Sequence, residues 1–193
     1  MDTVATVPFS STRAYLLEAR YEFLRLLRTP SFSLPCLLFP PVFYLLFGVL
    51  LGGKGGPVAA QYLLAGYGVF GVIGVALFGF GVTVALDREQ GLLTLKRAQP
   101  MPPGAYLVAK MAMALLFAAI ILLLLAALAA GVAHVRLSAA QWGAWAATCL
   151  IGVLPFSALG LWLGTLVGGR GAPALINLVY LPMAFLSGLW VPL

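Results

Sequence analysis

The charged stretch Asp87–Pro102, which reads DREQGLLTLKRAQPMP, lies between two long apolar runs of this chain. It contains three basic and two acidic side chains, whereas the apolar runs on either side contain one lysine, Lys110. Charge concentrated between lipid-soluble segments is typical of a loop at a membrane surface. The stretch therefore predicts a membrane protein whose loop offers a docking surface to a soluble partner.

The composition places the chain among polytopic membrane proteins. Of its 193 residues 63% are hydrophobic and only 8% are charged, whereas a soluble domain has roughly 25% charged residues. The net charge of +6 would suit nucleic acid, but the predicted loops account for it and no such partner is expected. Cys36 and Cys149 lie in apolar runs without metal-ligand spacing, so neither a disulfide framework nor a metal site is predicted.

Five apolar segments reach the roughly 20 residues needed to cross about 30 Å of hydrocarbon. They lie near residues 31–51, 62–86, 105–130, 142–167 and 172–192. The sequence thus predicts an all-α, polytopic membrane helix bundle. Residues 1–30 would form a cytoplasmic N-terminal segment, and residues 31–193 a single transmembrane domain.

The distribution of Lys and Arg indicates a cytoplasmic N-terminus. With that orientation the inner side holds nine of the eleven basic residues, and the outer loops hold Lys54 and Arg136. All five acidic residues also fall on the inner side. An excess of basic residues in cytoplasmic loops sets the topology of most membrane proteins.

Residues 10–28 have the pattern of an amphipathic helix. One face, at about 100° per residue, collects the apolar side chains of Tyr15, Leu16, Ala19, Phe23, Leu26 and Leu27. The charged residues, Glu18 and Glu22 among them, lie off that face. Ser10 or Ser11 can cap the start of the helix, and Thr29-Pro30 ends it. We expect this helix along the inner membrane surface, either as a general anchor or as a specific docking element.

The predicted span interiors contain no Asp, Glu, His or Arg, and Lys110, near an inner end, is expected to reach water. Because an ion-coupled carrier needs an ionisable group at mid-depth, that class is disfavoured. Residues 52–56 lack the spacing of a phosphate loop, and His134 is expected to be an ordinary solvated residue. No catalytic residue or bound cofactor is predicted, so any ATP would be bound by another chain.

Proline and glycine patterns leave both a packing and a pathway interpretation open. Three spans carry proline near mid-depth, at Pro40-Pro41, Pro155 and Pro182. These prolines either kink the spans or line a pathway. Gly160, Gly164 and Gly168 form a ridge of small residues that favours close helix packing. The many glycines of the second span suit packing, or a smooth wall beside a substrate or a second protomer.

The charged stretch itself has the pattern of a short helix. Asp87 with Gln90 resembles a capping box, and the prolines that follow would end the helix. Leu92, Leu93 and Leu95 are too apolar for a freely solvated loop, so a groove on a cytosolic partner would bury them. The charged residues at the rim of that contact would be Arg88, Glu89, Lys96 and Arg97. The alternative is a positive loop folded onto the membrane.

Three motifs follow one another along the chain. They are Arg28-Thr29-Pro30-Ser31-Phe32 after the amphipathic helix, Asp87–Leu93 with Pro100 and Lys110, and Asn177–Gly188 with Pro192. Together they cover essentially the whole chain, and their order and spacing resemble the type 2 family of ABC transporter permeases. Leu92 stands where that family often has Thr. The family has six spans, so this chain, which stops after the fifth, is expected to be C-terminally incomplete.

The resemblance implies a permease half that pairs with a second protomer and with two ATP-binding subunits, which would use ATP and Mg. The implied ATPase-coupling residues are Asp87, Arg88, Glu89, Gly91, Leu92, Leu93, Leu95, Lys96 and Arg97. The substrate pathway would be lined from the second and fifth spans by Tyr67, Phe70, Gly74, Phe78, Asn177, Tyr180 and Pro182. The implied location is the bacterial inner membrane.

The favoured function is therefore ATP-driven export of an amphipathic or hydrophobic compound. A non-transporting membrane scaffold or immunity-type protein is the alternative, and an ion-coupled carrier is the least favoured class. The pathway candidates would suit an apolar drug, a glycolipid or a polymer equally well. Asn177 would either bond to a neighbouring helix or face the pathway.

Overall fold

The computed structural model describes residues 11–50, 56–99, 102, 104–186 and 189. Within these ranges every regular element is a helix, which confirms the predicted all-α fold class. Several residues named above lie outside the described ranges: Ser10, Gly52, Gly53, Lys54, Gly55, Pro100, Ser187, Gly188 and Pro192.

The first two long apolar segments combine α-helix with π-helix. α2 (Pro30–Tyr44) continues into η1 (Leu45–Leu50). α3 (Gly56–Gly74) continues through η2 (Val75–Val82) into α4 (Thr83–Glu89). A π-helix is rare and occurs mostly as a short insertion in an α-helix, frequently at a functional site.

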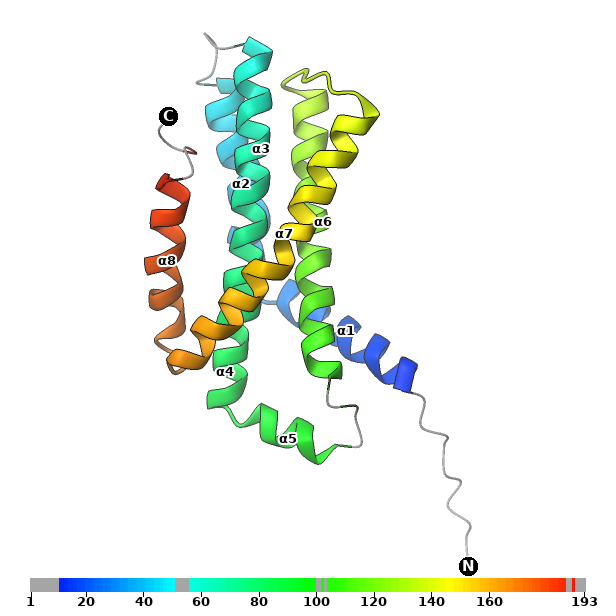
Figure 1. The fold of residues 1–193 in the computed structure, drawn as a ribbon, viewed down its shortest axis with the longest axis vertical. Helices are drawn as coiled ribbons and strands as arrows, with labels where there is room; N and C mark the ends of the chain where they lie inside the picture. The colour runs from blue at the N-terminus through cyan, green and yellow to red at the C-terminus, as the bar shows by residue number, and fades with distance from the viewer. Residues whose placement is uncertain (1–10, 51–55, 100–101, 103, 187–188, 190–193) are drawn as a thin grey trace, which may run out of the picture.

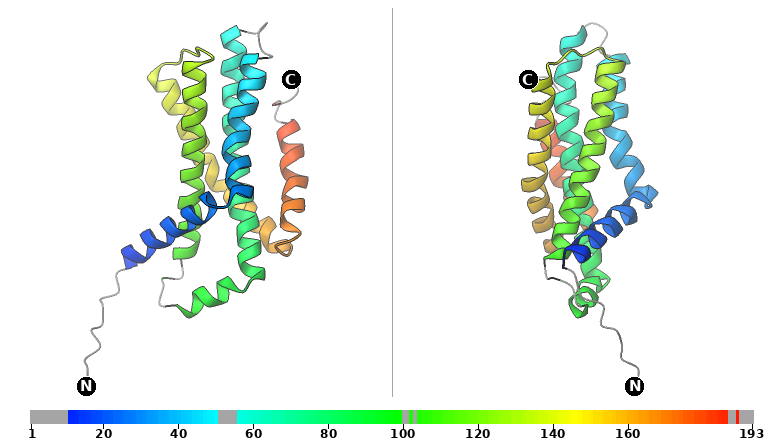
Figure 2. Two further views of the ribbon diagram at one scale, coloured as in Figure 1. Left: turned by 180° about the vertical axis from the view of Figure 1, so that it is seen from behind. Right: turned by 90° about the vertical axis from the view of Figure 1, so that its right-hand side faces the viewer.

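The remaining helices are α1 (Ser11–Leu27), α5 (Leu92–Ala98), α6 (Ala105–Gly131), α7 (Ala139–Leu166) and α8 (Ala172–Leu186). α1 and α5 lie at the same end of the bundle, and α8 lies on the side of α3 opposite to α6 (Figures 1 and 2). α7 starts three residues before the predicted fourth span because Ser138 and Gln141 form a capping box at its start.

Four helical segments of the described chain are long and apolar enough to cross a membrane. They are Pro30–Leu50, Val58–Glu89, Ala105–Gly131 and Ala139–Leu166. The predicted fifth span is represented by α8, whose 15 residues extend about 22 Å at 1.5 Å per residue. This helix is shorter than the roughly 30 Å hydrocarbon layer.

One face of α6 contributes much of the apolar core. Met113, Phe117, Ile121 and Leu125 are fully buried and recur every four residues, so they lie on one face of the helix. The ring of Phe117 lies 5.2 Å from that of Phe23 in α1, measured between ring centroids. The apolar face of α6 therefore joins the N-terminal helix to the membrane-spanning bundle.

The orientation of α1 differs from the prediction in part. Tyr15, Ala19, Phe23 and Leu26 of the predicted apolar face are partly or fully buried, but the acidic side of the helix is packed as well. Glu22, expected off the packed face, is only 4% exposed, whereas Leu16 of the predicted apolar face is 68% exposed. Glu18 is also partly buried. The prediction failed because basic side chains of the bundle attract these two carboxylates, an interaction between distant segments that helical periodicity does not contain.

The predicted capping box at Asp87 is wrong. The helix of the second span does not stop at Leu86 but continues to Glu89, so Asp87 lies inside α4. Gly91 then adopts a left-handed conformation, with φ at 72°, and α5 begins at Leu92. Glycine suits this position because a side chain would disfavour positive φ.

η2 and α7 approach each other backbone to backbone. A Cβ atom added to Gly81 would lie 2.5 Å from the carbonyl oxygen of Gly160, and one added to Gly164 would lie 2.5 Å from that of Gly81. Gly168, the third glycine of the predicted ridge, follows the end of α7 and is exposed. Gly81, Gly160 and Gly164 permit this contact because they have no side chains.

Alanine at these glycines should destabilise the bundle. We expect Gly81→Ala and Gly164→Ala each to lower the free energy of unfolding by about 1–3 kcal/mol, since the added methyl group meets rigid backbone. Gly152→Ala, also in α7, is the control because nothing lies within 4 Å of its added Cβ. Thermal unfolding of the purified protein measures this effect. Equal melting temperatures for Gly164→Ala and Gly152→Ala would contradict the assigned contact.

Candidate functional site

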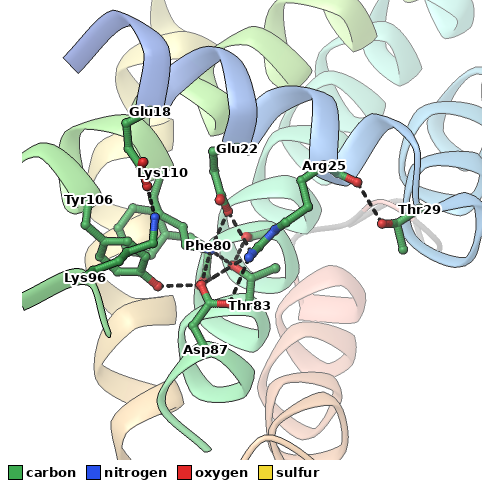
Figure 3. A network of polar contacts seen from close by, with 11 residues as sticks. Glu18, Glu22, Arg25, Thr29, Phe80, Thr83, Asp87, Lys96, Tyr106 and Lys110 are labelled. Atoms are coloured by element: carbon green, nitrogen blue, oxygen red, sulfur yellow. Dashed lines mark hydrogen bonds and ion pairs between the residues drawn. The ribbon is translucent and has the colours of Figure 1, made fainter. Parts of the chain in front are cut away.

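Four charged side chains meet where α1, α4 and α6 come together (Figure 3). Glu22 and Arg25 come from α1, Asp87 from the end of α4, and Lys110 from α6. Glu22, Asp87 and Lys110 are buried, and the side chain of Arg25 is 40% exposed. We call these four residues the charge cluster.

Lys110 is the central cation of the charge cluster. Its Nζ lies 2.5 Å from Oε1 of Glu22 and 2.8 Å from Oδ2 of Asp87, and it donates to the hydroxyl of Thr83 at 2.8 Å. Three donors thus have three acceptors. The expectation that Lys110 reaches water is wrong, because its side chain is 0% exposed.

Asp87 is the central anion. It accepts hydrogen bonds from Arg25 Nη1 at 3.0 Å and from the hydroxyl of Tyr106 at 2.7 Å. Arg25 also pairs with Glu22 at 3.0 Å. Two carboxylates and two cations therefore balance each other, and a buried ion pair needs this compensation because desolvation of each charge is costly.

The charge of Arg25 is favoured by its neighbours. Burial by itself would lower the pKa of the guanidinium, but the hydrogen bond to Asp87 and the charge of Glu22 outweigh burial and raise it. Arg25 therefore stays ionised and holds α1 against the end of α4.

A second ion pair connects α5 to α1. Lys96 of α5 bonds to Glu18 of α1, and its ammonium lies 5.3 Å from the centroid of the Tyr106 ring. Burial lowers the pKa of Lys96, and repulsion from Lys110 lowers it further. α5 is thus held beside the charge cluster by its own partly buried lysine.

Thr83 connects the charge cluster to η2. Its hydroxyl lies 2.6 Å from the carbonyl oxygen of Gly79, to which it donates, and 3.2 Å from that of Phe80. The same hydroxyl accepts from Lys110. A displacement of Lys110 would therefore act directly on the π-helical part of the second span.

Most charged residues of the predicted coupling loop form hydrogen bonds or ion pairs with other parts of the same chain. Besides Asp87 and Lys96, Arg88 donates to the carbonyl oxygens of Thr165 and Val167, at 2.8 and 2.9 Å. These carbonyls belong to the end of α7, where a cation is favourable. Glu89 accepts a hydrogen bond from the backbone N–H of Arg170 at 3.3 Å. These contacts help to position the loop, while Arg88 and Glu89 themselves remain exposed.

The exposed face of α5 is narrower than predicted. Leu95 is 61% exposed, and Arg97 is also exposed. Leu93 instead packs beside the buried side chains of Phe80 and Tyr106. Leu92 is half-buried. A partner that docks on α5 would meet chiefly the side chains of Leu95 and Arg97.

An apolar pocket of about 540 Å³, partly open at the protein surface, lies between α2, the second span and α8. Five of the predicted pathway residues line it: Phe70, Gly74, Phe78, Asn177 and Tyr180. Tyr67 is buried outside the lining, and Pro182 is exposed outside it. We call this space the first chamber.

α2 contributes one wall of the first chamber, which sequence reasoning missed. Its lining side chains include Phe32, Cys36, Phe39 and Phe43. Their spacing places them near one face of a helix, and this signal is visible in the sequence. Periodicity alone does not say which neighbouring helix that face meets.

The contribution of Lys110 to the stability of the charge cluster can be tested by substitution. Lys110→Met should lower the free energy of unfolding by about 3–5 kcal/mol, because Glu22 and Asp87 lose a buried partner. Arg97→Gln, which removes an exposed cation, should change stability by less than about 0.5 kcal/mol. Chemical denaturation of the purified variants compares the two. Equal stability of both would show that Lys110 is not a central ion-pair partner.

The chain is similar to known transport permeases over most of its length. The profile of the family described as ABC-2 type transporter matches residues 14–193. A protein of Bacillus subtilis (strain 168) named "Putative transport permease YvfS" is 28% identical over 176 residues, which cover 89% of this chain and 71% of that protein. No solved structure matches the chain.

Proposed function

This chain belongs to the ABC-2 type transporter family, and from this premise we propose that it is the permease of an ATP-driven exporter. It is a multi-pass membrane permease subunit of that family. A separate subunit, present in two copies, would hydrolyse ATP with Mg, and a second permease protomer would complete the membrane part. The N-terminus would lie in the cytoplasm of a bacterial cell, with the protein in the inner membrane and α8 as part of a fifth span.

One observation supports coupling through the charged loop. α5 has an exposed apolar side chain, Leu95, and an exposed cation, Arg97, which flank Lys96 in the sequence, and Lys96 attaches the helix to α1 through its pair with Glu18. A central apolar anchor with a charge at its edge is the usual anatomy of a protein contact. The ATPase would bind the exposed side chains of α5.

The charge cluster would carry the movement into the membrane. A shift of α5 moves Glu18 and hence α1, whose Arg25 and Glu22 hold Asp87 and Lys110. Asp87 lies in α4, which continues the second span, and Lys110 lies in α6. The bundle would then change between two packed states, which partner binding biases.

The first chamber supports an apolar cargo. Its lining contains aromatic rings, the hydroxyl of Ser31, one amide and one thiol but no charged side chain. An anion in this space would lack a buried partner, which is costly. A compound with apolar or aromatic groups is therefore the proposed substrate class, and a chamber of this size favours transport over a scaffold role.

The docking face can be tested in a complex reconstituted with a candidate ATPase. Leu95→Glu and Arg97→Glu should each lower transport-coupled ATPase activity about tenfold or more, since loss of an interface anchor costs at least about 1.4 kcal/mol. Arg136→Glu, an exposed charge reversal between α6 and α7, is the control and should leave coupling intact. Undiminished coupling in Leu95→Glu would rule out α5 as the contact.

A further inference from the structure

A second cavity lies on the other side of the contact between α3 and α8. It has a volume of about 440 Å³ and is lined by α3, by Phe156 of α7 and by α8. Its lining extends along α3 to Tyr62, whereas that of the first chamber extends along η2 to Phe78. We call this space the second chamber. The two chambers are thus offset along the second span.

Two residues line both chambers: Phe70 of α3 and Tyr180 of α8. Their ring centroids lie 5.0 Å apart. The hydroxyl of Tyr180 donates a hydrogen bond to the carbonyl oxygen of Phe70 at 3.1 Å. At the level of Phe70 and Tyr180, the two chambers are therefore separated by a contact between two rings and by one side-chain hydrogen bond.

Gly74 provides the space that this hydrogen bond needs. A Cβ atom added at Gly74 would lie 3.2 Å from the hydroxyl oxygen of Tyr180. On its other side the Tyr180 ring meets the ring of Phe78 edge to face, with centroids 5.6 Å apart. The hydroxyl is thus held at one position, between a glycine and two aromatic rings.

The packing of α8 indicates where it can move. Its buried Ile176 packs with Leu77 of η2 and Leu163 of α7, on the side of Tyr180 nearer the charge cluster. Beyond Tyr180, α8 borders the second chamber with Met183 and Ala184 and the first chamber with Leu181 and Phe185. A helix that is packed at one end and borders a cavity at the other can tilt with little loss of contact.

We propose that the contact of Tyr180 with Phe70 is a gate between the two chambers. The gate is closed in this structure, and it opens when the hydroxyl leaves the Phe70 carbonyl and the α3–α8 contact widens. An apolar substrate then moves from the first chamber to the second without meeting a charged side chain. This proposal rests on the proposed transport function and identifies the step that it needs within one protomer.

The first test measures whether the chambers become connected, and it requires no transport. Cys149, which lies outside both linings, is replaced by alanine to remove its thiol. The native Cys36 then labels the first chamber, and Met183→Cys puts a second thiol in the second chamber. A flexible apolar bis-maleimide is added to the reconstituted complex. The intramolecular product between positions 36 and 183 is measured by mass spectrometry, relative to single labelling of each thiol.

Tyr180→Phe keeps the ring but removes the hydrogen bond, so we expect cross-linking to be several-fold faster. Tyr44→Phe is the matched control, because the buried Tyr44 hydroxyl has no hydrogen-bond partner among the described residues. Equal cross-linking rates in Tyr180→Phe, Tyr44→Phe and the parent protein would overturn the gate.

The second test separates the gate from the transport proposal. In proteoliposomes with the ATPase and an apolar fluorescent dye, Tyr180→Phe should hydrolyse several-fold more ATP per dye molecule moved. Its docking on the ATPase should match that of the parent, because Tyr180 lies far from α5 in the sequence and lines only the chambers. An unchanged ratio would count against the gate. If the parent protein itself moves no dye with ATP, the proposed export of such compounds fails, while the cross-linking result still decides the gate.

Discussion

The ammonium of Lys110, enclosed in the bundle with no exposed surface, determines how this end of the molecule is built. A buried cation without partners would be strongly destabilising, so carboxylates must reach it. Asp87 does so because the second span continues as a helix beyond its apolar part. Glu22 does so because α1 turns its acidic side inward, at the cost of leaving Leu16 exposed.

This constraint also places the candidate functional surfaces. The carboxylates that neutralise Lys110 fix α1, and α1 fixes α5 through Glu18 and Lys96. α5 therefore lies with Leu95 outward. On the membrane side Lys110 bonds to Thr83, whose hydroxyl bonds to carbonyls of η2, and η2 borders the first chamber through Phe78. A continuous series of polar contacts thus leads from the exposed loop to the cavity wall.

The sequence was sufficient for features that depend on local chemistry. Hydropathy and segment length predicted the helical class and the positions of the long apolar helices, because a span must hide its backbone from lipid over a fixed thickness. The pattern of residues 10–28 predicted a helix, and the chemistry of residues 87–102 predicted a charged, partly apolar loop.

Features that depend on contacts between segments far apart in the sequence could not be predicted from it. Glu22 and Lys110 are 88 residues apart, and a periodicity rule places any glutamate on the outer face. In the sequence, Asp87 followed by Gln90 is as compatible with the start of a helix as with its interior. In the structure Asp87 lies inside α4 and pairs with Arg25. Phe32 and Phe43 gave no sign that they would face α8 across a cavity. In each case the missing information was the packing of one helix against another.

The most direct test of this account is a charge exchange between α1 and α5 in the complete complex. Lys96→Glu alone puts a third carboxylate near Glu18 and Glu22 and should uncouple ATP hydrolysis from transport. Glu18→Lys combined with Lys96→Glu restores an opposite-charge pair and should recover most of the coupling. If the double exchange is as uncoupled as the single one, or if Lys96→Glu has no effect, the connection between the loop and the bundle is not the one described.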